Sequence, residues 1–428
     1  MCRQAEFINF EKYLLLGQYD DQGNFIKYFS DHVDRSISQA KQARVSHDIM
    51  KTPENILLII RRSLGDVLAM SPVIDILSRQ FPNVSIDLLV NSDTVAAAEL
   101  LKSIHRIIVF EENLPKNNLL FSLKMQISLM RRIFRKYDLA ISFTTNERSN
   151  IYAFLAGRIS VGTREPNLSK NWWHRMLVDA GYQYNPKRHI LENNVAALRL
   201  LGINIDRIVL SARYSEEAKQ RVRQILKDLS IERFIIFHPT GKFQCRLYPE
   251  KSRNTLLQLL NSLNIPIIVT GGKSDIDRQV LAEMPVLQNV YSLIGKISIE
   301  ECAALTDMSS AFVGVDTFNC HLAAAFNKPI FVIFGPNIPE VWSPWSNALQ
   351  KGGRQALPVQ TYGDITLFQS SLKCVPCGHS ARCGDRDRLS PCMADIDPHL
   401  VFTEAQRWLV KCLSESNENA KKTDLPAK

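Results

Sequence analysis

The chain has 428 residues, 45% hydrophobic and 22% charged, which is typical of a soluble globular protein with two domains. No apolar run reaches the ~20 residues of a membrane-spanning helix, and the first residues, MCRQAEFINFEKY, lack the basic and apolar parts of a secretory signal. We therefore expect a cytoplasmic protein, with a formal net charge of +9.

Residues 1–50 show no clear strand period, and we interpret them as an N-terminal extension. A regular alternation begins at Asn55 and defines a first domain over residues 51–210. Its expected strands and helices follow in chain order: strand 56–62, helix 63–81, strand 84–90, helix 94–101, strand 106–110, basic amphipathic helix 119–137 and strand 138–143. Such alternation predicts a parallel sheet with helices on both faces.

A second strand and helix series follows residues 202–215, where the strand pattern is lost. It comprises strand 233–238, helix 252–263, strand 266–272, helices 274–284 and 298–308, and strands 311–316 and 329–335. This pattern predicts a second α/β domain over residues 211–400. Residues 401–428 are expected to form one more amphipathic helix, over 403–413, followed by a disordered tail.

Polar residues stand at the ends of three of these strands, where ligands bind in open parallel sheets. Asp66 follows the first strand in Ser-Leu-Gly-Asp, and it is either a helix cap or a general base. His238-Pro-Thr240-Gly241-Lys242, with Arg246 close behind, could form a phosphate cradle from backbone amides, a hydroxyl and two cations.

The third strand end lies in VGVDTFNCHLAAAFNKPIFVIFGP, residues 313–336. Asp316 and Thr317 end the strand, and His321 lies one turn into the next helix. A helix N-terminus attracts anions through its N–H groups, so this segment is a second candidate phosphate site. The alternative for His321 is a buried histidine with satisfied hydrogen bonds.

Three blocks of the chain resemble glycosyltransferase family 9, the heptosyltransferase-like family, over roughly residues 55–412. They are ILLIIRRSLGDVLAMSPVIDIL, KYDLAISFTTNERSNIYAFLAGRISVG, and the long segment from YSLIGKISIEE to NIPEVWSPW. The resemblance implies a GT-B fold, with two Rossmann-like domains facing across a cleft and a C-terminal helix that crosses back to the first domain.

The resemblance also implies an inverting, metal-independent transfer of a sugar, often heptose from ADP-heptose, to lipopolysaccharide core or a related glycan. By position, Asp66 matches the base that deprotonates the acceptor hydroxyl. The residues that match the donor and phosphate site are Thr240, Gly241, Lys242, Arg246, Asp316, Thr317, Phe318 and His321. Phe318 stands where the family has Gly, and Arg246 where it usually has Lys; the first change removes the most permissive backbone position beside the phosphates.

The first domain is expected to face an anionic acceptor. Residues 119–190 hold twelve Lys or Arg against four Asp or Glu, without an RNA-binding motif, so no nucleic-acid partner is expected. Under the transferase interpretation Arg62 and Arg148 lie on the acceptor side. The basic face that includes Arg131, Arg132, Arg135 and Lys136 suits peripheral association with the cytoplasmic face of the inner membrane, or is ordinary solvated surface.

Two other functions share this architecture. A sugar-nucleotide 2-epimerase has two similar domains but uses other carboxylates. A degenerate transferase kept as a binding or scaffold protein is favoured only by Phe318, because Asp66 and His321 are both present.

Four cysteines cluster before the last helix, at Cys374, Cys377, Cys383 and Cys392, with His379 beside them. Cys-x-x-Cys with two further cysteines in a short loop is a metal-binding pattern. A structural zinc is one interpretation, and free or redox-linked thiols are the other. Neither implies a cofactor for catalysis.

Overall fold

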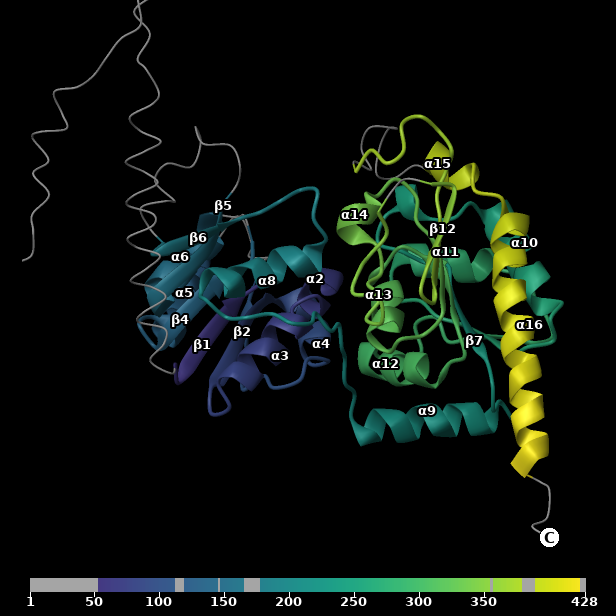
Figure 1. The fold of residues 1–428 in the computed structure, drawn as a ribbon, viewed down its shortest axis with the longest axis horizontal. Helices are drawn as coiled ribbons and strands as arrows, with labels where there is room; N and C mark the ends of the chain where they lie inside the picture. The colour runs from purple at the N-terminus through teal and green to yellow at the C-terminus, as the bar shows by residue number, and fades with distance from the viewer. Residues whose placement is uncertain are drawn as a thin grey trace, which may run out of the picture.

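The computed structural model describes residues 53–111, 119–144, 147–164, 178–354, 357–378 and 389–423. The predicted N-terminal extension, residues 1–50, lies outside this part of the chain. Figure 1 shows two α/β domains side by side, the first in purple to teal and the second in teal to yellow. The α/β class and the two Rossmann-like domains of the predicted GT-B fold are confirmed.

The first domain is built on a six-stranded sheet in the order β3-β2-β1-β4-β5-β6, and all its neighbouring strands are parallel. The strands are β1 Asn55–Ile59, β2 Ser85–Asn91, β3 Arg106–Phe110, β4 Tyr137–Ser142, β5 Gly157–Arg164 and β6 Ala180–Gln183. The helices are α2 Leu64–Leu68, α3 Ser71–Gln80, α4 Val95–Ala98 after the short η2 Ser92–Thr94, α5 Leu119–Ile133, α6 Glu147–Ala156 and α8 Ile190–Leu200.

Strand β1 is buried on both faces, which explains why it is a continuous apolar run rather than an alternating one. Leu57 and Ile59 pack with Leu129 and Ile133 of α5. Ile56 and Leu58 belong to a larger core that also contains Phe312 of the second domain. The two domains therefore share packed apolar side chains.

The second domain has a seven-stranded sheet in the order β12-β13-β11-β10-β7-β8-β9. The strands are β7 Ile235–His238, β8 Ile267–Val269, β9 Val290–Ser292, β10 Phe312–Val315, β11 Ile330–Ile333, β12 Val359–Tyr362 and β13 Ile365–Phe368. The helices are α9 Glu216–Asp228, η3 Gln244–Arg246, α10 Glu250–Asn261, α11 Asp275–Glu283, α12 Ile299–Met308, α13 Phe318–Ala325, α14 Pro339–Trp342, α15 Pro391–Ala394 and α16 Pro398–Thr423.

The hairpin of β12 and β13 was not predicted from the sequence. The two strands are antiparallel, and Gly363 between them has a φ of 57°, which glycine adopts readily. Strand β13 pairs in parallel with β11 and so extends the sheet beyond the α/β alternation.

The segment that joins the domains, residues 201–215, contains no regular helix or strand, as predicted. It is held by both domains: the backbone N–H of Arg213 donates to Leu100 O at 2.8 Å, and that of Leu210 donates to Asn347 Oδ1 at 2.9 Å. The predicted boundary at residue 210 falls within this segment.

The C-terminal helix differs from the prediction in two ways. It begins at Pro398 and continues to Thr423, because residues 414–423 contain helix-forming Glu, Ala and Lys and neither Gly nor Pro. It also does not cross back to the first domain. Val401, Ala405 and Leu409 pack in the core of the second domain, and Figure 1 shows α16 along its far side, beside α10.

Within the described residues, no helix combines the length and the apolar character needed to cross a membrane.

Candidate functional site

The structure brings the polar ends of β1 and β10 together where the two domains meet. Helix α2, which follows β1, packs against α13, which follows β10. A Cβ atom on Gly65 would lie 3.7 Å from His321 Cδ2, so the turn before Asp66 directly faces the imidazole. The predicted base and the predicted donor side therefore meet across the domain junction.

Asp66 is both a helix cap and a candidate base, the two interpretations left open by the sequence. It occupies the third position of α2, where its Oδ2 accepts hydrogen bonds from Ser63 N at 3.2 Å and Ser63 Oγ at 2.6 Å. Its Oδ1 lies 3.1 Å from Arg62 Nε but is buried without a hydrogen-bond partner among the described residues. Oδ2 caps the helix, and Oδ1 can still accept a hydrogen bond from a ligand.

Arg62 links this carboxylate to the second domain. Its guanidinium pairs with Asp66 and also lies 5.4 Å from the ring centroid of Trp342 in α14. The expected acceptor-side position of Arg62 is thus beside the candidate base. Arg148, the other predicted acceptor-side residue, lies exposed at the start of α6, where its charge acts on Tyr152.

At the start of α13, Asp316 has neighbours at both oxygens. Asn337 Nδ2 donates a short hydrogen bond to Oδ2. Cys320 Sγ, which donates to Thr317 O at 2.9 Å, lies 3.8 Å from Oδ1, and His321 Nε2 lies 3.9 Å from the same Oδ1. Burial lowers the pKa of His321, although Asp316 and Asp66 oppose the shift, so the imidazole is neutral at neutral pH. Asp316 therefore holds the residues around it in place.

Thr317 is the N-cap residue of α13, but its hydroxyl does not cap the helix. Thr317 Oγ1 is buried and has no hydrogen-bond partner among the described residues. Thr, Ser, Asp and Asn at this position usually satisfy an N–H of the first turn, so the start of α13 is available to an external acceptor.

The first turn of α13 is instead fixed by a chain of hydrogen-bonded side chains, of which His238 and Thr270 are buried. Cys302 Sγ donates to Asn319 Oδ1 at 3.2 Å, and Asn319 Nδ2 lies 3.0 Å from His238 Nε2. His238 Nδ1 lies 2.9 Å from Thr270 Oγ1. Because the amide nitrogen can only donate, Nε2 of His238 accepts and Nδ1 carries the proton. Burial lowers the pKa of His238 to about 4, which matches this neutral form.

The turn after β7 lies beside the same helix start. A Cβ atom on Gly241 would be 3.6 Å from Thr317 Cγ2. Arg246, in η3, has a buried Nε without a partner among the described residues, and Lys242 is exposed. The backbone turn at Gly241 therefore lies beside the open start of α13, and Arg246 follows it five residues later in η3.

Thr240 is already bonded inside the protein. Burial alone would raise the pKa of Asp277, but hydrogen bonds from Ser274, Thr240 and Gly272 hold it below its ordinary value. The hydroxyl proton of Thr240 thus goes to Asp277, and this residue fits a role in fixing the turn rather than in donating to a phosphate.

Phe318, the predicted departure from the family pattern, is accommodated without backbone strain. It is the first residue of α13, and its φ is not positive. Its side chain is partly buried and packs against the core. Its N–H remains part of the open helix start, so the loss of glycine changes the surroundings of the site rather than its backbone.

A group of metal-ligand types also lies here. The donor atoms of Asp316, Cys320 and His321 lie within 4.8 Å of one another. Burial, and then Asp316, raise the pKa of Cys320 well above its ordinary value, so its thiol is protonated. Among the described residues, Cys374, Cys377 and Cys392 do not form such a group. Cys383 and His379 lie outside the described residues.

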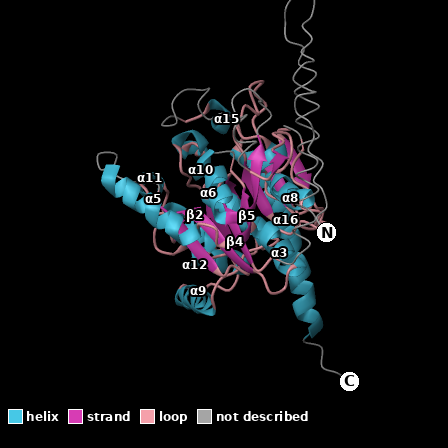
Figure 2. Cartoon of the chain, turned by 90° about the vertical axis from the view of Figure 1, so that its left-hand side faces the viewer, coloured by secondary structure: helices cyan, strands magenta, loops and turns pink. Residues whose placement is uncertain are grey.

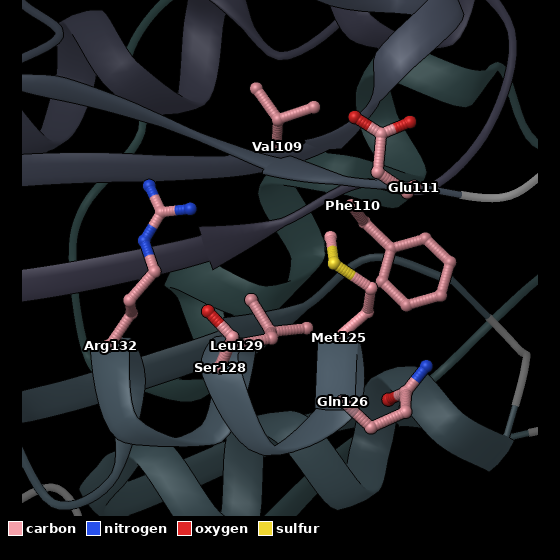
Figure 3. Close-up of a pocket in the computed structure, with 8 residues that line it drawn as sticks. All are labelled: Val109, Phe110, Glu111, Met125, Gln126, Ser128, Leu129 and Arg132. Atoms are coloured by element: carbon pink, nitrogen blue, oxygen red, sulfur yellow. The ribbon is translucent and has the colours of Figure 1, made fainter. Parts of the chain in front are cut away.

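A pocket lies away from this site, between the end of β3 and α5 (Figure 3). Phe110 and Glu111 line it on one side, and Gln126, Leu129 and Arg132 of α5 on the other. It contains none of the predicted catalytic or donor residues.

Sequence reasoning missed Asn337, Trp342 and Asn319 as contributors to the site. Asn337 follows the apolar strand β11 and the turn Gly335-Pro336, which is the same strand-end signal that identified Asp66 and Asp316. Trp342 and Asn319 carry no local signal, because their partners Arg62 and His238 are distant in the sequence.

Residues 126–363 of the chain match the model of glycosyltransferase family 9 (heptosyltransferase), a match that includes the β7 turn and α13 but not Asp66. Lipopolysaccharide heptosyltransferase 3 of Escherichia coli is 24% identical over 307 residues, 66% of this chain and 84% of that protein.

Two solved structures have the same fold. E. coli ADP-heptose lps heptosyltransferase II has a TM-score of 0.62 at 17% identity and covers 83% of this chain and 99% of its own. E. coli heptosyltransferase WaaC with ADP-2-deoxy-2-fluoro heptose has a TM-score of 0.60 at 16% identity, with coverage of 82% and 99%. Because the family model matches more than half of the sequence, the chain belongs to glycosyltransferase family 9 and is a glycosyltransferase.

Proposed function

We propose that this enzyme transfers a heptose from ADP-heptose to a lipopolysaccharide core or a related cell-surface glycan, by an inverting displacement without a metal ion. Its similarity to a lipopolysaccharide heptosyltransferase and to an ADP-heptose lps heptosyltransferase supports the donor and the acceptor class. Peripheral association with the cytoplasmic face of the inner membrane would bring it to such an acceptor.

One observation carries the proposed chemistry. Asp66 Oδ1, Arg246 Nε and Thr317 Oγ1 are all buried, and none has a hydrogen-bond partner among the described residues. Buried polar atoms in folded proteins are nearly always hydrogen-bonded, so these three atoms suggest a ligand. An acceptor hydroxyl can donate to the carboxylate, and a diphosphate can accept from the guanidinium and the hydroxyl.

The proposed mechanism assigns each domain one half of the reaction. Asp66 Oδ1 takes the proton of the acceptor hydroxyl while that oxygen attacks the anomeric carbon on the face opposite the nucleotide. The bond to the diphosphate breaks, and its electron pair leaves with the nucleotide. Arg246, Lys242, the Thr317 hydroxyl and the N–H groups of α13 stabilise the charge that develops there.

Arg62, Asp316 and His321 have supporting roles in this mechanism. Arg62 holds the Asp66 carboxylate from 3.1 Å. His321 lies with its Nε2 3.9 Å from Asp316 Oδ1, and its neutral imidazole can hydrogen-bond to the donor sugar without placing a second cation beside the base. The convergence of Asp316, Cys320 and His321 makes metal independence a point to measure directly, by transfer in the presence of a strong chelator.

A donor panel tests the proposal. Purified enzyme is incubated with ADP-heptose, a UDP-sugar and a GDP-sugar, with and without a lipopolysaccharide-core acceptor, and transfer, donor hydrolysis and thermal shift are measured. We expect transfer and stabilisation with ADP-heptose. Stabilisation by UDP compounds alone would overturn the donor assignment. Epimerised sugar without acceptor would favour a 2-epimerase, and binding without turnover would favour a scaffold.

We further propose that the four cysteines bind a structural zinc, which would draw together Cys374, Cys377 and Cys392, three residues that do not converge in this structure. Their spacing supports this, and Cys392 is buried at the start of the C-terminal region in α15. Metal analysis of the purified protein, repeated for the double variant Cys374→Ser/Cys377→Ser, distinguishes bound zinc from thiols. One equivalent of zinc lost in the variant is expected, whereas metal-free wild-type protein would contradict it.

A further inference from the structure

Helix α5 forms one side of the first domain and packs against the sheet through one face. Leu129 and Ile133 are buried in the core beneath it, with Phe110 and Tyr152. Figure 2 shows α5 as a long helix at the outside of the molecule, and Figure 1 places it on the part of the first domain away from the second. Its outer face therefore does not contribute to the domain junction that carries Asp66.

The outer face of α5 is apolar where a solvated helix would be polar. Leu123 is 57% exposed, Ile127 44% and Phe134 55%. At 3.6 residues per turn, positions 123, 127 and 134 lie within roughly 40° of one another around the helix axis. Large apolar side chains exposed singly are ordinary, but these form one stripe.

Cations lie on one side of this stripe, because at 3.6 residues per turn Lys124 and Arg131 are roughly 60–80° from its centre, whereas Arg132 is on the opposite side of the helix. Lys124, Arg131 and Arg132 of α5 and Lys136 just beyond it are exposed. Helix α5 contains no Asp or Glu, and in the described part of the chain none of these four cations is paired with a carboxylate. Arg132 also borders the pocket that Glu111 lines, as Figure 3 shows. Arg135 differs, since its Nη1 donates to Gly157 O at 2.8 Å.

We propose that the outer face of α5 is a docking surface for an anionic phospholipid bilayer. An apolar stripe with flanking cations and no acidic residue is the pattern of a helix that lies in the membrane interface. Leu123, Ile127 and Phe134 enter the boundary between headgroups and acyl chains, while the cations contact lipid phosphates. A protein partner would have to supply both an apolar groove and matching carboxylates, so a bilayer is the simpler occupant.

This inference rests on the proposed function in one respect, because a lipid-bearing acceptor gives the enzyme a reason to be at a membrane surface. Docking through α5 also leaves the junction of α2 and α13 uncovered. The acceptor could then reach Asp66 while the first domain stays on the bilayer.

Vesicle flotation tests the surface with the full chain. Wild-type protein is mixed with vesicles of phosphatidylcholine alone, or of phosphatidylcholine with one third phosphatidylglycerol, at low and high salt. We expect binding to the anionic vesicles only, weakened at high salt. The variants Leu123→Ser/Ile127→Ser and Lys124→Glu/Arg131→Glu are each expected to reduce partitioning by about tenfold or more.

Matched controls come from exposed residues of the second domain. Leu281→Ser/Val410→Ser removes exposed apolar side chains of α11 and α16, and Lys227→Glu/Lys251→Glu removes the same number of cations. Both controls should float like wild type. Because all these positions are exposed, unchanged melting temperatures are expected throughout.

Two vesicle results would overturn the proposal: wild-type protein that does not bind anionic vesicles, or α5 variants that bind them as well as wild type. A third such outcome is that the α5 variants leave vesicle binding unchanged but alter the oligomeric state, measured by light scattering. The last would make α5 a contact between copies of this chain. The variant Asp66→Asn should still float. Vesicle binding that depends on α5 in a protein without transferase activity would refute the proposed function and leave the docking surface standing.

Discussion

Two helices begin at the domain junction, α2 and α13, and their first turns are built in opposite ways. Helix α2 is closed by its own side chains, because Ser63 and Asp66 form a capping box. Helix α13 has a Thr at the N-cap whose hydroxyl caps nothing, and it is held from below through Asn319 and His238. The first helix start positions a carboxylate, and the second leaves its N–H groups for an anion.

The carboxylates at these two helix starts also differ in their contacts. Asp66 uses one oxygen for the cap and pairs the other with Arg62, whereas Asp316 accepts a short hydrogen bond from Asn337 on one oxygen and has Cys320 and His321 beside the other. Two carboxylates at similar strand ends therefore have different uses: the first can accept a proton, and the second positions neighbouring side chains.

The largest expected effect comes from Asp66→Asn. An amide oxygen can still accept from Ser63, so the cap remains while the base is lost. We expect transfer to fall by about 10²–10⁴-fold with little change in melting temperature. Steady-state transfer kinetics and thermal unfolding measure both.

Glu301→Gln is the matched control for that variant. Glu301 also forms a capping box, with Ser298 at the start of α12, and pairs with Arg221 Nε at 2.7 Å, as Asp66 does with Arg62. It should leave transfer within a few-fold of wild type. Equal losses in the two variants would reduce Asp66 to a cap.

Lowering the pH below neutral should reduce the stability of the folded protein, including the side chains that support α13. Burial lowers the pKa of His238 and of His189 to about 4 each, whereas an unfolded histidine titrates near 6.5. The unfolded chain therefore binds protons first as pH falls. Stability is fully present above about pH 6.5 and declines toward pH 4, by about 3 kcal/mol for each histidine. Urea unfolding across this range measures the decline.

The variant His238→Gln identifies the source of that pH dependence. It keeps a polar side chain next to Asn319 but cannot titrate, so roughly half of the decline expected from the two histidines should disappear. His189 provides the remainder, since its Nε2 donates to Ser343 O at 2.8 Å across the domain junction. An unchanged slope would show that His238 is not the titrating group.

The open start of α13 is tested by Arg246→Ala. Removing a charged donor to a phosphate should weaken ADP binding by about 1.5–3 kcal/mol, roughly ten- to a hundredfold, measured by calorimetry. Arg278→Ala is the control, because Arg278 is exposed on α11 and pairs locally with Asp275. If both variants bind ADP equally well, the phosphate site lies elsewhere.

The smallest effect is expected at Gly65. A Cβ atom there would make an ordinary contact with His321 Cδ2 at 3.7 Å, and alanine is a better helix residue than glycine. Gly65→Ala should therefore raise the free energy of unfolding by up to about 1 kcal/mol while lowering transfer a few-fold, because it narrows the space beside Asp66. A loss of stability would contradict the spacing of α2 and α13.

Much of the fold could be predicted because its signals are local. The apolar strands, the helical spacing between them and the polar residues at the strand ends each occupy a few consecutive positions. The C-terminal helix shows where this fails. Its length follows from local helix propensity, which the prediction underestimated. Its packing on α10 depends instead on where Val401, Ala405 and Leu409 find an apolar partner.

By itself the sequence determined two α/β domains and named Asp66, Thr317 and His321 as candidates, because periodicity and strand ends are properties of neighbouring residues. Only the tertiary structure decided which atoms remain available. Thr240 is hydrogen-bonded to Asp277 and Asp316 to Asn337, while one oxygen of Asp66, Nε of Arg246 and the Thr317 hydroxyl have no hydrogen-bond partner in the described chain. Hydrogen bonds between residues distant in sequence leave no local pattern, so only the folded chain reveals them.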